Sequence, residues 1–67
     1  MPEQLTWNKK LEIRRVTLDL TQEQAADLIG VPIGTYGRWE RGNNKPIKVY
    51  EKAIAEAFEI EAFEIFD

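Results

Sequence analysis

Residues 20–31 read LTQEQAADLIGV and residues 36–42 read YGRWERG, and these two stretches decide the fold. In the first stretch, Thr21 is followed three residues later by Gln24. This spacing is typical of a capping box, in which the two residues satisfy each other's backbone N–H groups at the start of a helix. A short helix is therefore expected over residues 22–29.

A glycine turn joins this helix to the next one. Gly30 suits the left-handed conformation in which many helices end. A second helix is expected from about Ile33 to Arg41, with Gly42 directly after it. Two short helices joined by a glycine turn of this length form a helix-turn-helix unit, here at about residues 21–41.

Helices are also expected on both sides of this unit. Thr6 can cap a first helix whose apolar residues follow at roughly helical spacing. These residues are Trp7, Leu11 and Leu18. After the unit, Pro46 disfavours helix at the residue before it, and residues 47–58 carry the pattern of an amphipathic helix. The sequence thus predicts an all-α chain.

The end of the chain holds a tandem repeat. Residues 56–60 and residues 61–65 both read EAFEI, and a break in the helix is expected near Glu59. Because the whole chain has only 67 residues, it is expected to form one domain over residues 1–67.

Composition excludes several kinds of site. The chain has no cysteine and no histidine, so disulfides, thiolate metal sites and the commonest general base near neutral pH are absent. We expect no catalytic residues, no metal, no cofactor and no small-molecule substrate. No apolar run approaches the roughly 20 residues of a membrane helix, and no signal peptide is visible. A cytoplasmic protein without membrane contact is expected.

The charge is unevenly distributed. The net charge is −3, but residues 1–50 carry eight Lys and Arg against six Asp and Glu. Residues 51–67 carry one Lys against six acidic residues. A mildly basic body is compatible with a nucleic-acid face, and the acidic tail is expected to point away from any phosphates.

The two quoted stretches together resemble the Cro/CI-type (Xre family) helix-turn-helix repressors, in which L-T-Q, A, G-V and W-E-R-G recur in this register before a loop with a proline. The likeness extends over residues 5–66. It implies a lambda-repressor-like DNA-binding domain of four to five short helices. It further implies a transcriptional regulator that binds operator DNA as a dimer, with its recognition helix in the major groove.

Several positions in the motif have a structural meaning under this resemblance. Ala26 must be small because the two motif helices cross there, and Val31 fills the angle between them. Tyr36 and Trp39 are expected in the core. Arg15 and Glu40 match two family positions that resemble a buried or half-buried ion pair between the first helix and the end of the recognition helix.

The resemblance also assigns the DNA contacts. Gln22, at the start of the second helix, would bind a phosphate through its side chain and a backbone N–H. The candidates for reading bases are Ile33, Gly34, Thr35, Gly37 and Arg38. The candidates for binding the phosphate backbone from the loop after the recognition helix are Arg41, Asn43, Asn44 and Lys45.

This sequence departs from the family pattern in the recognition helix. Pro32 stands where a Ser or Thr usually caps this helix, so that side-chain contact is lost. Gly34 and Gly37 have no side chain with which to read a base, and each costs about 1 kcal/mol of helix propensity. Arg38 is therefore the one candidate with the two-pronged guanidinium that suits guanine.

The tail has more large apolar residues than so small a domain easily buries. We expect Phe63 to pack inward, while Ile65 and Phe66 contribute to a two-fold dimer contact with acidic side chains at its rim. A frayed terminus is the alternative, and a paired strand is another, because Phe58, Ile60 and Ala62 alternate with glutamates.

A second class of function stays open from the sequence. The same fold can serve as a protein-interaction or antitoxin-like module, for which the acidic apolar tail would be the partner surface. Comparing binding to random duplex DNA at low and high salt distinguishes the two classes.

Overall fold

The computed structural model describes residues 5–66, and within this range it contains five helices and no strand. The helices are α1 (Trp7–Thr17), α2 (Gln22–Ile29), α3 (Ile33–Arg41), α4 (Lys48–Phe58) and α5 (Phe63–Phe66). The all-α prediction of four to five short helices is confirmed. Residues 1–4 and 67 of the expected single domain lie outside the described residues.

The ends of α2 follow from local sequence. The backbone N–H of Gln24 donates to Thr21 Oγ1 at 3.0 Å, and the N–H of Thr21 donates to Gln24 Oε1 at 2.9 Å, which completes the capping box. Gly30 ends the helix at φ 96°, a left-handed conformation that costs glycine little. Both features agree with the prediction.

The start of α1 differs in one respect from the prediction. Thr6 has the extended backbone of an N-cap residue, and its carbonyl accepts from the N–H of Lys10 at 3.0 Å. Its hydroxyl, however, makes no capping hydrogen bond. Tertiary contacts therefore support this end, and Trp7 packs against the core directly after it.

The chain does turn at the predicted break. Glu59 ends α4 in the left-handed conformation at φ 59°, and the N–H of Ile60 donates to the carbonyl of Ala55 at 3.0 Å. The interpretation of residues 58–62 as a paired strand is wrong, because Phe58 is helical and the segment after it turns into α5.

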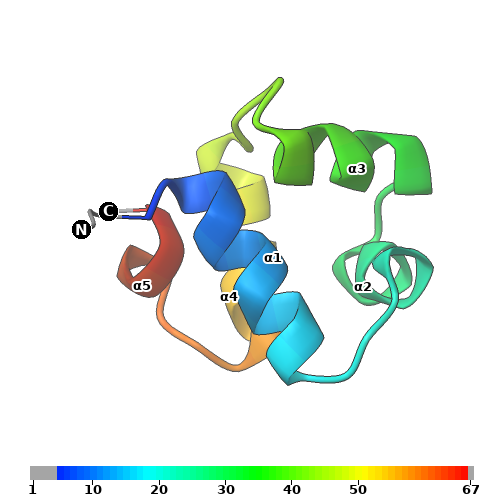
Figure 1. Cartoon of the computed structure of the whole chain (residues 1–67), viewed down its shortest axis with the longest axis horizontal. Helices are drawn as coiled ribbons and strands as arrows, with labels where there is room; N and C mark the ends of the chain where they lie inside the picture. The colour runs from blue at the N-terminus through cyan, green and yellow to red at the C-terminus, as the bar shows by residue number, and fades with distance from the viewer. Residues whose placement is uncertain (1–4, 67) are drawn as a thin grey trace.

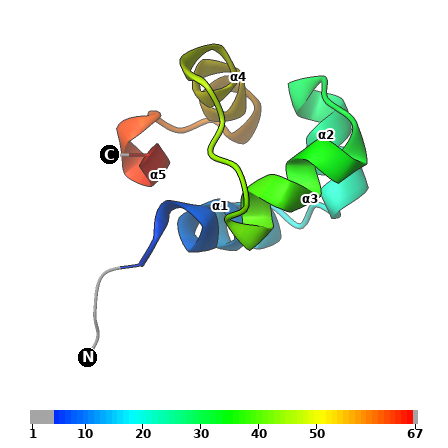
Figure 2. The same cartoon turned by 90° about the horizontal axis from the view of Figure 1, so that it is seen from above.

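The five helices pack around one apolar core. Helix α3 contacts both α1 and α2, while α5 contacts α1 and α2 contacts α4. Helices α2 and α5 lie at opposite ends of the molecule in both views (Figures 1 and 2). The buried core residues come from all five helices and the α2–α3 turn, and they are Leu11, Ala25, Ala26, Val31, Tyr36, Trp39, Ile54, Phe58 and Ile65.

The packing role of the motif residues agrees with the sequence. Ala26 is 1% exposed and Val31 is 8% exposed at the junction of α2 and α3. Tyr36 and Trp39 are buried and meet edge to face, with ring centroids 6.0 Å apart. Helices α2 and α3 thus pack against each other and share buried apolar residues.

The predicted orientation of the tail is wrong. Phe63 is 66% exposed, whereas Ile65 is 3% exposed and belongs to the core. Phe66 is partly buried, and its ring lies 6.1 Å from that of Trp7. Successive helical residues turn by about 100°, so residues 63 and 65 lie about 200° apart and cannot both face inward.

No helix among residues 5–66 is long and apolar enough to cross a membrane.

Candidate nucleic-acid interface

Helix α3 presents a solvent-facing surface that carries most of the predicted DNA contacts. Ile33, Gly34 and Arg38 are exposed on it, and Thr35 is half-buried. Pro32 precedes the helix in an extended conformation, and it supplies no side-chain cap because the proline ring has no acceptor atom. The exposed residues of α3 thus include two guanidinium groups, those of Arg38 and Arg41, beside the apolar Ile33 and the small Gly34.

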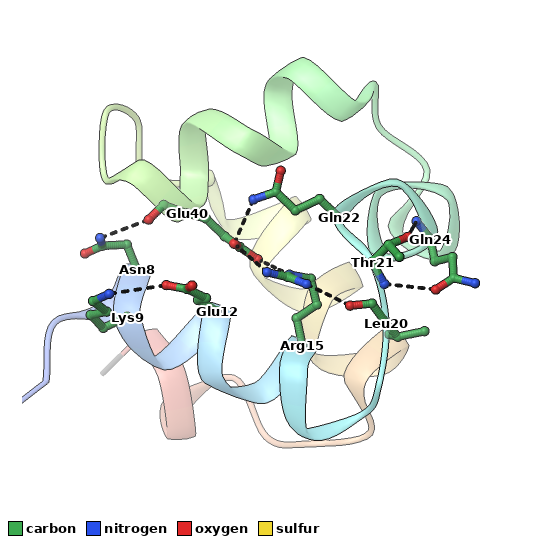
Figure 3. Close-up of polar contacts among 9 residues, drawn as sticks. All are labelled: Asn8, Lys9, Glu12, Arg15, Leu20, Thr21, Gln22, Gln24 and Glu40. Carbon is green, nitrogen blue, oxygen red and sulfur yellow. Dashed lines mark hydrogen bonds and ion pairs between the residues drawn. The ribbon is translucent and has the colours of Figure 1, made fainter.

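An ion pair joins α1 to α3 (Figure 3). Arg15 Nε donates to Glu40 Oε2 at 2.6 Å, and Arg15 Nη2 donates to Glu40 Oε1 at 3.2 Å. Their side chains are 13% and 5% exposed. Arg15 Nη1 also donates to the carbonyl of Leu20 at 2.7 Å, so the guanidinium ties α1 to the start of the helix-turn-helix unit and to α3.

The charge states of this pair reinforce one another. Burial raises the pKa of Glu40, but hydrogen bonds from Arg15 and Gln22 favour the carboxylate, and the net pKa lies below its ordinary value. The hydrogen bond to Glu40 likewise raises the pKa of Arg15. Both groups are therefore charged at neutral pH.

Tyr36 lies beside this pair. Its hydroxyl is buried without a hydrogen-bond partner among the described residues. Burial, followed by the neighbouring Glu40 carboxylate, raises the pKa of Tyr36 well above its ordinary value. The hydroxyl is near enough to help lower the pKa of Glu40, although it falls short of hydrogen-bond geometry.

Gln22 belongs to the same network. Its Nε2 donates to Glu40 Oε1 at 2.9 Å (Figure 3). The amide nitrogen must face Glu40, because an ionised carboxylate can only accept. This bond uses one of the two Nε2 hydrogens, so the second hydrogen and the backbone N–H are left for the predicted phosphate contact. The sequence motif did not reveal this tie to α3.

Gly37 does not occupy the outward position that was predicted for it. It is buried, although Gly34 and Arg41 on the same helix face are exposed. A Cβ atom on Gly37 would lie 3.3 Å from Arg41 Nη1 and 3.9 Å from Gln22 Oε1. The Arg41 side chain therefore folds back over Gly37, and base reading by Gly37 stays a prediction.

The loop after α3 carries the remaining candidates. Asn43, Asn44 and Lys45 are all exposed. The N–H of Asn43 donates to the carbonyl of Arg38 at 3.0 Å, so the start of the loop is fixed to the recognition helix.

Asn8 is a residue that sequence reasoning missed. Its Nδ2 donates to the Glu40 carbonyl at 3.1 Å, and its side chain lies against Gly42, where a Cβ atom would be 3.2 Å from Asn8 Cγ. Asn8 thus holds the end of α3 from a helix 32 residues away. No local pattern could signal a contact at this separation.

The chain matches known proteins in both sequence and structure. The family model HTH_3, described as helix-turn-helix, matches residues 11–65. The restriction-modification controller protein C.AhdI from Aeromonas hydrophila shares 32% identity, with a TM-score of 0.85 over 90% of this chain and 91% of that one.

A second solved structure is the P22 c2 repressor in complex with the synthetic operator 9T. It shares 19% identity with this chain, with a TM-score of 0.90 over 96% of this chain and 97% of that one. At this identity the likeness concerns the fold. No curated protein sequence matches the chain significantly.

Proposed function

The chain belongs to the helix-turn-helix family HTH_3 and is a sequence-specific DNA-binding transcription regulator; from this premise we propose that it binds operator DNA as a homodimer, with α3 in the major groove. In this proposal, Arg38 reads bases, with apolar contacts from Ile33 and Thr35. Arg41, Lys45 and Gln22 bind phosphates on either side of α3.

One observation carries this proposal. The exposed end of α3 is followed directly by the exposed loop, and three of the basic residues of the chain lie on these two segments, namely Arg38, Arg41 and Lys45. Phosphate contacts by such residues supply most of the affinity for DNA and make it depend on salt. Of the acidic residues of the tail, Glu59, Glu61 and Glu64 lie just before or in α5, whereas Glu51 and Glu56 lie on α4. Helix α5 is at the other end of the molecule from α2 (Figure 1).

Removing either phosphate-binding residue is expected to weaken binding to every DNA sequence alike. Arg41→Ala and Lys45→Ala should each reduce the slope of log K against log salt by about one, because each removes about one phosphate contact. Fluorescence anisotropy with a pool of random-sequence duplexes measures this slope. Lys9→Ala is a matched control, because Lys9 is exposed on α1 and pairs there with Glu12.

An unchanged slope in both variants would remove the loop and Arg41 from the DNA contact. A wild-type chain that binds no duplex at low salt would instead contradict the proposed function as a whole and favour the protein-interaction alternative.

We place the proposed dimer contact on a surface that does not include Ile65. Ile65 is buried and cannot meet a partner, whereas Phe63 is exposed beside a groove of about 610 Å³ along α4. The residues lining this groove are Lys48, Glu51, Lys52, Ala55, Glu56, Ile60, Glu61 and Ala62. Phe63 and Phe66 line the adjoining depression, which shares Lys48, Glu51 and Ala62 with the groove.

The charges along this groove favour a second copy of the chain as its occupant. Lys48 and Lys52, with Glu51 between them, lie in the first half of α4 and leave it with a net positive charge, whereas Glu56 near the end of α4 and Glu61 after it are both acidic. A two-fold axis across α4 sets the two helices antiparallel, so the basic end of each faces the acidic end of the other. Phe63 would then be the apolar anchor of an otherwise polar contact.

Phe63→Glu is expected to weaken dimerisation by about 30-fold or more, the effect of losing a central apolar anchor. The fold should be unaffected, since the side chain is 66% exposed. Sedimentation equilibrium over a range of protein concentrations measures the change, and circular dichroism monitors the fold. Val16→Glu is the control, because Val16 is 58% exposed on α1. Equal dimerisation by the wild type and Phe63→Glu would exclude this surface.

A further inference from the structure

The Arg41 guanidinium is the group nearest to Gly37, and the Gln22 side-chain oxygen comes next. On α3, residues 34, 37 and 41 share a face, and only the middle one is buried. The guanidinium of Arg41 makes this cover, since a Cβ atom on Gly37 would lie 3.3 Å from its Nη1 and 4.0 Å from its Cζ. Helical side chains lean toward the N-terminus, so a residue four positions later reaches back over its predecessor.

Glycine at position 37 lowers the stability of α3, but a larger residue there would displace Arg41. Glycine in a helix interior is less favourable than alanine. A methyl group here would lie 3.3 Å from Arg41 Nη1, which is shorter than the roughly 3.5–4 Å at which non-bonded atoms pack best. The guanidinium would therefore have to move away. Because the displaced atoms are the far end of an exposed, flexible side chain, the fold itself would not suffer.

The position of the guanidinium has a consequence for DNA binding. Arg41 Nη1 and Gln22 Oε1 lie 3.3 Å and 3.9 Å from the position that a Cβ atom on Gly37 would take, so the Arg41 guanidinium and the side chain from the start of α2 lie on the same side of Gly37. We propose that Gly37 is a positioning residue, which leaves room for Arg41 to lie beside Gln22 so that both address the same phosphate. This inference rests on the proposed DNA-binding function.

Gly37→Ala is expected to separate stability from binding. Its unfolding midpoint should rise by roughly 4–8 °C, because alanine is the better helix former. Gly34→Ala is the stability control, since a Cβ atom there meets nothing within 4 Å and alanine is again the better helix former. Affinity of Gly37→Ala for random-sequence duplexes at low salt should fall about five- to tenfold, and the salt slope should fall by about one.

Arg41→Ala makes the test specific to the arginine. In the Arg41→Ala background, adding Gly37→Ala should change DNA affinity no further, because the side chain that the methyl displaces is already absent. An equal loss in both backgrounds would mean that the methyl itself obstructs DNA, and this would overturn the proposal. Unchanged affinity of Gly37→Ala in the otherwise wild-type chain would overturn it as well.

A measurement without DNA tests the packing by itself. Nuclear Overhauser contacts between the Gly37 Hα and Arg41 Hδ protons are expected in the free protein, and their absence would refute the placement of Arg41. If these contacts are present but the wild type binds no duplex, the proposed function fails, and Gly37 is left with a packing role only. The two failures are therefore distinguishable.

Discussion

Glu40→Gln is expected to lower the free energy of unfolding by about 3–5 kcal/mol, the usual cost of removing one partner from a buried ion pair. The change keeps the shape of the side chain but leaves Arg15 without its carboxylate. It also sets an amide N–H₂ group where both carboxylate oxygens now accept, from Arg15 and from Gln22. Urea titration followed by circular dichroism measures the loss.

A double-mutant cycle isolates the pair itself. Arg15→Met alone should also destabilise the chain, because it leaves the Glu40 carboxylate buried at 5% exposure. The double variant should be less destabilised than the sum of the two single ones. Glu12→Gln is the surface control: its partner Lys9 is 59% exposed, and the expected change is below about 0.5 kcal/mol. A coupling near zero would show that the pair contributes nothing specific.

Glu40→Gln should also alter the pH dependence of stability. Because folding lowers the pKa of Glu40, its contribution is complete above the ordinary glutamate pKa of about 4.3 and is lost as the pH falls through the lower folded-state value. The wild type should therefore lose stability in this acidic range, and Glu40→Gln should lack that part of the loss. Parallel acid titrations of the two proteins test this.

Arg38→Ala is expected to lower affinity for the best operator by about 1–3 kcal/mol, or about 5- to 150-fold, while binding to random DNA changes little. The physical reason is that a bidentate guanidinium contact to guanine exists only at the correct base pair. Arg38 is exposed and is the one residue with this fork among the base-reading candidates on α3. Selection of sites from a random duplex pool, followed by anisotropy titrations, supplies both affinities.

Arg41→Ala is the matched control for this experiment, because it should weaken specific and random binding together. If Arg38→Ala did the same, Arg38 would be a phosphate contact. Because α3 has few other side chains that can read bases, the specificity would then come from DNA shape. The fold should be unchanged in either case, which thermal unfolding verifies.

Sequence reasoning succeeded where the deciding interactions are local or belong to the family motif. The capping box joins residues three positions apart, and Gly30 ends α2 through its own backbone freedom. The pairing of Arg15 with Glu40 came from the family resemblance, since no local rule links positions 25 residues apart.

The errors have a common origin. Phe63 and Ile65 exchanged their expected places because a helix of four residues has no periodic pattern long enough to mark its buried face. Gly37 was expected to face DNA because its position in α3 is outward by register. The covering group is a side chain, and its direction does not follow from the residue type of Gly37.

The sequence by itself determined the helices, their order and the helix-turn-helix unit, because backbone hydrogen bonds, caps and glycine turns act within about four residues along the chain. Only the tertiary structure decided what each surface presents. Gln22 is tied to Glu40, Asn8 holds the end of α3, and Arg41 covers Gly37. The first two contacts join residues 18 and 32 positions apart, and such contacts depend on how helices pack, which no local pattern encodes.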